Sequence, residues 1–178
     1  MRQNISSAVN RKIVFCALFA ALLACAAAGL WILWPGWQER FLWGCCLLVC
    51  ACQAKQDFES LTVSDGPTVL LALCAAAVRT LSGTAFDGLL GLIPGACLAP
   101  FAFLTLIGWG DVLLVMSVGA ALGLRWGLTA LGIGCFVAGL AAGIGLLTGK
   151  VRHGQVWPFA PVLFLGVFLA VFIPAVSF

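Results

Sequence analysis

The chain has 178 residues, of which 63% are hydrophobic and 8% charged, and its formal net charge is +3. So few charges exclude an ordinary water-soluble domain, and so small and scattered a net charge excludes a nucleic-acid-binding protein. Several uncharged apolar runs reach the length of about 18 residues at which a helix begins to cross a bilayer. Because strand alternation is absent, the sequence predicts a membrane protein built of helices.

About seven helices are expected in chain order. The fifth is the shortest, because roughly 15 residues rise only about 22 Å as a helix. No linker or second domain is visible, so the expected fold is an all-α polytopic bundle of six or seven transmembrane helices in one domain over residues 1–178. The expected helices are 13–34, 37–56, 66–82, 86–107, 110–124, 126–147 and 159–177.

The first apolar run, Ile13 to Trp34, follows basic residues and could therefore be a secretory signal. Its apolar core of about 22 residues is longer than a signal's apolar region, which has about 7–15. It also ends in Trp31, Trp34 and Pro35, which is typical of an interfacial anchor and not of a cleavage site. We therefore expect a first transmembrane helix.

The basic residues predict the orientation. Positive residues gather on the cytoplasmic side of membrane proteins, and most of them fall on the side of the N-terminus here. The sequence thus predicts a multi-pass membrane protein with its N-terminus on the cytoplasmic side. The inner set is Arg2, Arg11, Lys12, Lys55, Lys150 and Arg152, and the outer set is Arg40, Arg79 and Arg125.

Two other patterns suit a lipid environment. Tryptophans fall near expected helix ends, where an aromatic belt would place them. The stretches "VGAALGLRWG" and "GLAAGIGLLTG" carry small residues at helical spacing, which favours close contact between helices. The tryptophans are Trp37, Trp43, Trp109, Trp126 and Trp157.

Nine cysteines raise the question of a metal site. Nearly all of them lie inside apolar runs, no C-x-x-C pair occurs, and the single histidine, His153, is far from any cysteine cluster. Zinc needs converging ligands, so these cysteines are interpreted as small apolar residues between helices. We expect no metal and no cofactor.

Two of the six acidic residues stand out. Asp57 ends the run "FLWGCCLLVCACQAKQD", and Asp111 opens an expected helix after Gly108 and Gly110. Two membrane crossings separate them, so both carboxylates are expected at the cytoplasmic end of the bundle. Two nearby carboxylates share a proton and can act as acid and base on one water. The alternative is two unrelated aspartates at helix ends.

Three blocks resemble the type IV prepilin peptidase family, whose members are membrane-embedded aspartic proteases. The stretch "GWGDVLLVMSVGAALG" is similar to the GxGD motif and its helix. "DFESLTVSD" fits the motif in which an aspartate is followed six and seven residues later by Ile-Pro. "GKVRHGQVWPFAPVLFLG" is similar to the basic loop and Pro-Phe-Gly-Pro helix of the family. The order and spacing of all three blocks match.

The resemblance implies an endopeptidase that removes the leader of prepilins or pseudopilins at the cytoplasmic membrane face. Asp57 and Asp111 would be the catalytic pair, and Gly108 and Gly110 would let the backbone turn near them. The zinc-binding loop of larger members is missing before the first expected helix, so we expect no methyltransferase activity. The partners would be the prepilin substrate and the bilayer, with no nucleic acid. The basic loop, with Lys150 and Arg152, either sets topology or contacts substrate.

Three positions depart from the family pattern: Leu113 replaces Lys, Ser64 replaces Pro, and Ala160 replaces Gly. They leave both carboxylates in place but put a standard substrate in doubt. The competing hypotheses are an inactive relative and a small proton- or cation-coupled carrier.

One further expectation concerns the two aspartates. Asp57 ends a helix and Asp111 begins one, so the helix dipole favours the charged form of Asp111.

Overall fold

The computed structural model describes residues 20–34, 36–60, 62–105, 107–149 and 158–173. Every regular element in these ranges is a helix, so the expectation of an all-α chain is confirmed for the part of the chain that the structure describes. The elements are a first helix, Ala20–Leu33, followed by α2 (Trp37–Ser60), α3 (Asp65–Leu81), α4 (Ala85–Leu90), α5 (Ile93–Phe103), α6 (Trp109–Leu147) and α7 (Ala160–Val171).

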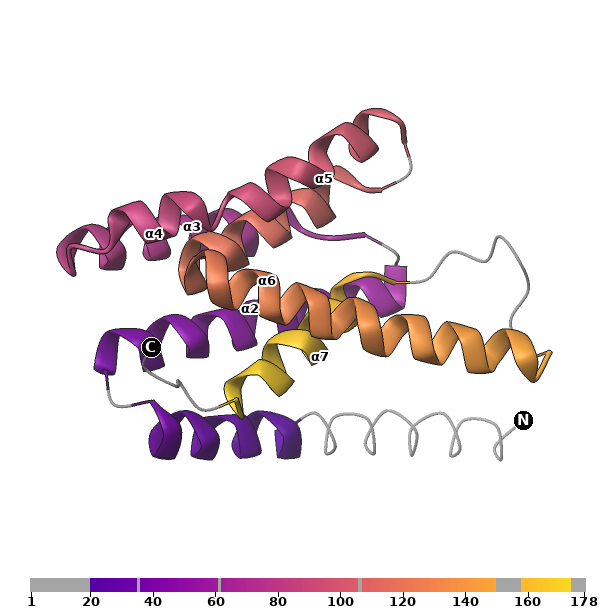
Figure 1. Ribbon diagram of the computed structural model, residues 1–178, viewed down its shortest axis with the longest axis horizontal. Helices are drawn as coiled ribbons and strands as arrows, with labels where there is room; N and C mark the ends of the chain where they lie inside the picture. The colour runs from indigo at the N-terminus through magenta and orange to yellow at the C-terminus, as the bar shows by residue number, and fades with distance from the viewer. Residues whose placement is uncertain (1–19, 35, 61, 106, 150–157, 174–178) are drawn as a thin grey trace, which may run out of the picture.

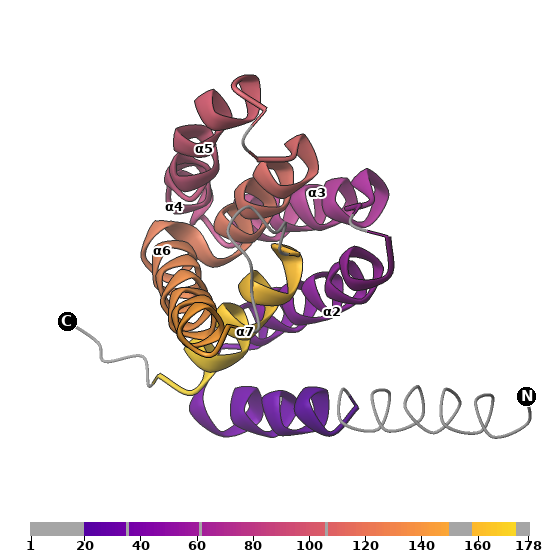
Figure 2. The same ribbon diagram turned by 90° about the vertical axis from the view of Figure 1, so that its right-hand side faces the viewer.

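The helices lie roughly along one axis and alternate in direction (Figure 1). α2 runs one way, α3 returns, and α4 and α5 run out again beside α6. α7 packs against both α2 and α6, and in the view turned by 90° it lies among the other helices (Figure 2). Alternation of this kind brings the end of α2, the beginning of α6 and the beginning of α7 to the same end of the molecule.

The helix expected over 86–107 is found as a helical segment over Ala85–Phe103, which a turn divides into α4 and α5 and which ends before 107. The break lies at Gly91 and Leu92, where α4 ends and a turn leads into α5. Gly91 lies directly against Gly119 of α6, and a Cβ on either glycine would overlap the backbone of the other. Close backbone contact of this kind is available only to the smallest residues.

α6 bends sharply at Gly123, which has a φ of +83° and lies outside the helical region. The chain then returns alongside itself, so α6 consists of two arms, 109–122 and 124–147 (Figure 1). A Cβ on Gly127 would lie 3.0 Å from the Cα of Gly119, which shows how closely the arms approach. The arms correspond to the helices expected over 110–124 and 126–147.

The two stretches of small residues behave differently. Gly119 and Gly127, in the first stretch, make the close contacts that their spacing predicts. In the second stretch, no atom of another segment that the structure describes lies within 4 Å of the position that a Cβ would take on Gly139 or Gly143. Within the described residues, these two glycines do not make the expected close helix contact.

Two helical segments are long and apolar enough to cross a membrane: Ala85–Phe103, with 19 residues, and Trp109–Leu147, with 39. Ala20–Leu33 and α7 are apolar but shorter. α7 ends at Val171, short of the expected boundary at 177. α2 in turn continues to Ser60, past the expected boundary at 56.

Three tryptophans form a cluster at the end of the molecule where α2 begins. The ring centroids of Trp34 and Trp43 are 5.0 Å apart, and Trp126 lies 5.0 Å from Trp34 and 5.9 Å from Trp43. Trp34 and Trp43 are each 2% exposed, and the Trp34 indole donates a hydrogen bond of 3.1 Å to the Val171 carbonyl. Trp34 is therefore not an interfacial anchor, and Trp43 and Trp126 join helices instead of forming a lipid-facing belt.

Candidate functional site

Asp57 lies in the last turn of α2 and is 5% exposed. Its Oδ2 accepts a hydrogen bond of 2.9 Å from the backbone N–H of Ala160, the first residue of α7. A carboxylate from one helix therefore caps the beginning of another. Buried carboxylates need such partners, because an isolated buried charge is costly.

The local sequence explains why α7 needs this cap. The first N–H groups of a helix have no partner within it. Pro161 has no N–H to satisfy, and the N–H groups of Val162 and Leu163 bond to the Phe159 carbonyl at 3.0 and 3.1 Å. The Ala160 N–H remains, and Asp57 accepts it.

Asp111 is the third residue of α6, after the N-cap residue Gly108. Its carboxylate lies beside this N-cap residue, since a Cβ on Gly108 would come 3.4 Å from the Asp111 Oδ2, and its side chain is half-buried. Asp57 lies near enough to act on the Asp111 carboxylate electrostatically. The structure thus brings together two carboxylates that are distant in the sequence.

The expected asymmetry between the two aspartates loses its basis in this geometry. Asp57 ends α2, as the sequence predicts, but its carboxylate also lies at the N-terminal end of α7. Asp111 lies at the N-terminal end of α6. Each carboxylate therefore faces the positive end of a helix, and the helix dipole does not separate them.

The role expected for the two glycines is also corrected. Gly108 has a φ of −69°, which any residue adopts, and Gly110 has no positive φ. Space is the reason for glycine at the second position, because a Cβ on Gly110 would lie 3.0 Å from the Cβ of Val63. Gly110 thus lets the loop before α3 pack directly against the start of α6.

The sequence analysis missed two contributors to this region. One is the backbone N–H of Ala160, whose pairing with Asp57 links distant segments and leaves no trace in the sequence. The other is Gln53, which lies one turn before Asp57 on the same buried face of α2 and is 1% exposed. A polar side chain at this position in an otherwise apolar run was the signal that could have indicated it.

The remaining predicted site residues are not part of this arrangement. Lys150 and Arg152, the candidates for substrate contact, lie outside the described residues. Leu113, which stands where the prepilin peptidases have Lys, is 38% exposed on α6. Within the described ranges, no three His, Cys, Asp or Glu side chains converge as metal ligands would.

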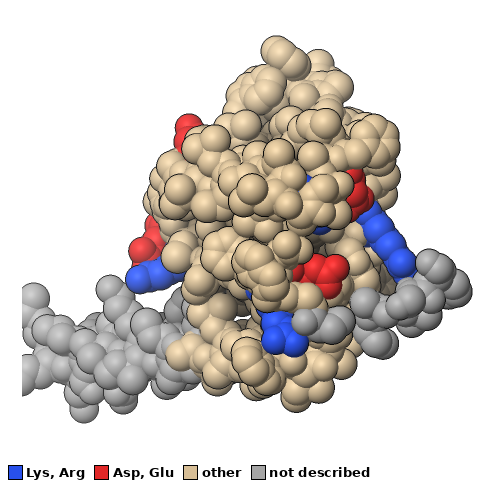
Figure 3. Space-filling model, turned by 90° about the vertical axis from the view of Figure 1, so that its left-hand side faces the viewer, with Lys and Arg blue, Asp and Glu red and all other residues tan. Residues whose placement is uncertain are grey.

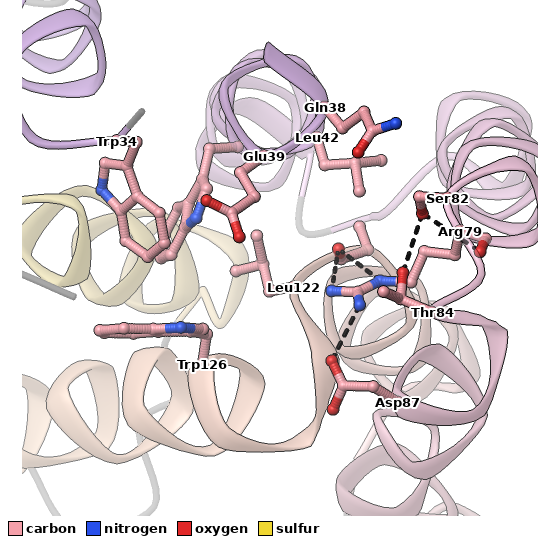
Figure 4. A pocket seen from close by; sticks show the side chains of 12 residues that line it. Trp34, Gln38, Glu39, Leu42, Arg79, Ser82, Thr84, Asp87, Leu122 and Trp126 are labelled. Atoms are coloured by element: carbon pink, nitrogen blue, oxygen red, sulfur yellow. Dashed lines mark hydrogen bonds and ion pairs between the residues drawn. The ribbon is translucent and has the colours of Figure 1, made fainter. Parts of the chain in front are cut away.

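A second polar cluster lies at the opposite end of the helices, near the bend of α6 (Figure 4). Arg79 of α3 forms an ion pair of 2.8 Å with Asp87 of α4. The same guanidinium donates two hydrogen bonds, of 3.2 and 3.0 Å, to the Ala121 carbonyl just before the bend. Glu39 and Trp126 border the same open cavity of about 260 Å³.

The surface at this end carries few charges. Figure 3 shows scattered blue and red side chains on a surface that is mostly uncharged. Many large apolar side chains elsewhere are exposed, including Leu73 at 63%, Phe136 at 68% and Leu140 at 53%. Apolar exposure on this scale is unusual for a protein surrounded by water.

Comparison of the chain with protein-family models, with curated proteins and with solved structures finds no match in any of the three.

Proposed function

We propose that this chain is a multi-pass membrane aspartic endopeptidase of the type IV prepilin peptidase kind. It removes the short leader from prepilin or pseudopilin precursors at the cytoplasmic face of a prokaryotic membrane. The resemblance of three sequence blocks supplies the family, since the comparisons add none.

The observation that carries the proposal is the meeting of Asp57 and Asp111. They come from the end of one helix and the start of another, and the Asp57 carboxylate is held by the Ala160 backbone N–H. Like charges brought together at a partly buried site oppose folding, so such a pair is a candidate for chemistry. The opposite-charge pair of Arg79 and Asp87 has an evident structural use and is no such candidate.

The exposed apolar surface and the two long apolar segments support a membrane location. α2, α3 and α7 run alongside these segments, so the proposed protein spans the bilayer several times. The predicted orientation puts Asp57 and Asp111 on the cytoplasmic side. Arg79 and the tryptophan cluster then lie on the other side.

The proposed mechanism uses one water molecule between the two carboxylates. One carboxylate removes a proton from the water, which attacks the carbonyl carbon of the scissile peptide bond. The other, protonated, donates its proton to the carbonyl oxygen. The C–N bond then breaks as the first carboxyl group passes the proton from the water to the leaving amine, and the second recovers its proton as the carbonyl re-forms. The Ala160 N–H bonds to Asp57 and holds that carboxylate in place while protons move.

The test is co-expression of the protein with each prepilin-like protein of its own genome, with leader removal scored by mass spectrometry. Wild-type protein is expected to cleave at least one candidate, and Asp57→Asn and Asp111→Asn are expected to cleave none. Asp87→Asn, the same substitution at the opposite end, is the matched control and retains cleavage. Cleavage by either Asp57→Asn or Asp111→Asn would exclude the catalytic pair.

Absence of cleavage by folded wild-type protein with every candidate would count against the peptidase. The inactive-relative and carrier hypotheses would then take its place, with Asp111 as a binding residue.

A further inference from the structure

We infer that Gln53 is a positioning residue that sets the geometry between Asp57 and Asp111, and that it does so by holding Ser64. The inference rests on the proposed function and deepens it. Gln53 does not touch either aspartate in the way a catalytic residue would. It acts through the segment between α2 and α3.

The Gln53 amide uses both its acceptor and its donor on that segment. Its Oε1 accepts a hydrogen bond of 2.9 Å from the Ser64 backbone N–H. Its Nε2 donates to the Ser64 carbonyl at 2.5 Å and to the Thr68 hydroxyl at 3.1 Å. Because Gln53 is 1% exposed, water does not compete for these bonds, and the side chain fixes the N-cap of α3 against α2.

The fixed segment then contacts the helix that carries the second aspartate. Val63, the neighbour of Ser64, packs against Gly110, leaving only 3.0 Å between its Cβ and the position of a Cβ on Gly110. Gly110 immediately precedes Asp111. A continuous series of contacts therefore runs from Gln53, one turn before Asp57, through Ser64 and Val63 to the start of α6.

The backbone of Ser64 supplies a way to test the hydrogen bond alone. Its φ of −82° and ψ of 129° are compatible with proline, which has no N–H. In the wild type, Ser64→Pro leaves the buried Gln53 Oε1 without its donor. In a Gln53→Met background, the same change removes a donor that already has no partner. The Ser64 carbonyl keeps a bond from the Thr68 hydroxyl, at 3.1 Å, in either background.

The experiment is a double-mutant cycle on the full chain in detergent, measured as melting temperature. Gln53→Met is expected to lower the melting temperature by about 4 °C or more. Ser64→Pro is expected to lower it in the wild type and to raise it in the Gln53→Met protein. Gln56→Met is the matched control, because Gln56 lies on the same helix with an exposed side chain, and it leaves the melting temperature unchanged.

Cleavage kinetics provide the readout that separates positioning from stability. At a temperature where all variants are folded, Gln53→Met is expected to lower kcat by about tenfold and leave KM within about twofold. Adding Ser64→Pro restores kcat to within about threefold of the wild type. A kcat unchanged by Gln53→Met, or an additive cycle in melting temperature, would overturn the inference. Since the stability cycle needs no substrate, it remains readable if the proposed function itself fails.

Discussion

The two ends of this helical protein use ionisable side chains in opposite ways. At the end where α2 finishes, Asp57 and Asp111 put two like charges together. At the end where α3 finishes, Arg79 and Asp87 form an ion pair of 2.8 Å. Opposite charges stabilise the structure that holds them, whereas like charges oppose it. Stability therefore explains the charges at the second end, whereas it does not explain those at the first.

The polar groups at the second end stabilise a break in a helix. The bend at Gly123 interrupts the ladder of α6, and carbonyls in the turn before a break lose their helical partners. Arg79 donates two hydrogen bonds to one of them, that of Ala121. At the first end, two carboxylates instead lie at the starts of α7 and α6, and the Ala160 N–H bonds to that of Asp57. Substitutions at the first end should therefore change cleavage, and those at the second should change stability.

The largest expected effect separates the two roles of Asp57. Asp57→Asn retains an oxygen for the Ala160 N–H but loses the carboxylate, so cleavage should fall by about a thousandfold or more with little change in stability. Asp57→Leu also leaves that N–H unpaired, which should cost a further 1–3 kcal/mol or so of stability. Melting temperature and cleavage rate, measured on both variants, check this. Equal stability of the two variants would mean that Asp57 does not cap α7.

The next largest effect is a loss of stability from a substitution at the second end, at the bend of α6. Gly123→Ala puts a side chain at a φ of +83° and drives its Cβ into the Asp87 carboxylate. A loss of about 2 kcal/mol or more of stability is expected, with cleavage per folded molecule retained. Gly139→Ala, in the second arm of α6 with open space around it, is the control and should be neutral or slightly stabilising. Loss of cleavage at unchanged stability in Gly123→Ala would break the division between the two ends.

A smaller effect distinguishes the two glycines near Asp111. Gly110→Ala forces Val63 away and should lower the cleavage rate about tenfold, because displaced catalytic groups lose alignment. In Gly108→Ala, the new Cβ would come no closer than 3.4 Å to the Asp111 carboxylate, so a milder change is expected. The two rates are to be compared under identical conditions. A larger loss from Gly108→Ala would favour the backbone-turning role that the sequence alone suggested.

Much of the fold could be predicted from apolar run length. The apolar runs around α2 and α3 predicted helices close to those observed. The two arms of α6 were predicted as separate helices, because a charged residue and glycines interrupt the apolar run near residue 125. The division of α4 from α5 could not be predicted, since it arises where Gly91 meets Gly119 from another helix. Burial of Trp43 was missed for a similar reason: a tryptophan near a helix end suits a lipid interface as well as a helix contact.

For the candidate site, the sequence indicated which carboxylates meet but not what holds them. Counting crossings between Asp57 and Asp111 was enough to put both at one end. The hydrogen bond from Ala160 joins segments that are far apart in the chain, and local pattern carries no information about it. The hydrogen bonds of Gln53 could have been predicted in part, because a buried glutamine in an apolar run needs hydrogen-bond partners nearby.

The most direct test of the account compares one substitution at the two ends. Asp111→Asn and Asp87→Asn are to be purified with the wild type, and their rates of leader removal measured on one substrate together with their melting temperatures. The account predicts a rate about a thousandfold or more below wild type for Asp111→Asn at a near-wild-type melting temperature. For Asp87→Asn it predicts a near-wild-type rate and a stability loss of at most about 1 kcal/mol. Near-wild-type cleavage by Asp111→Asn would contradict the claim that the paired carboxylates perform the chemistry.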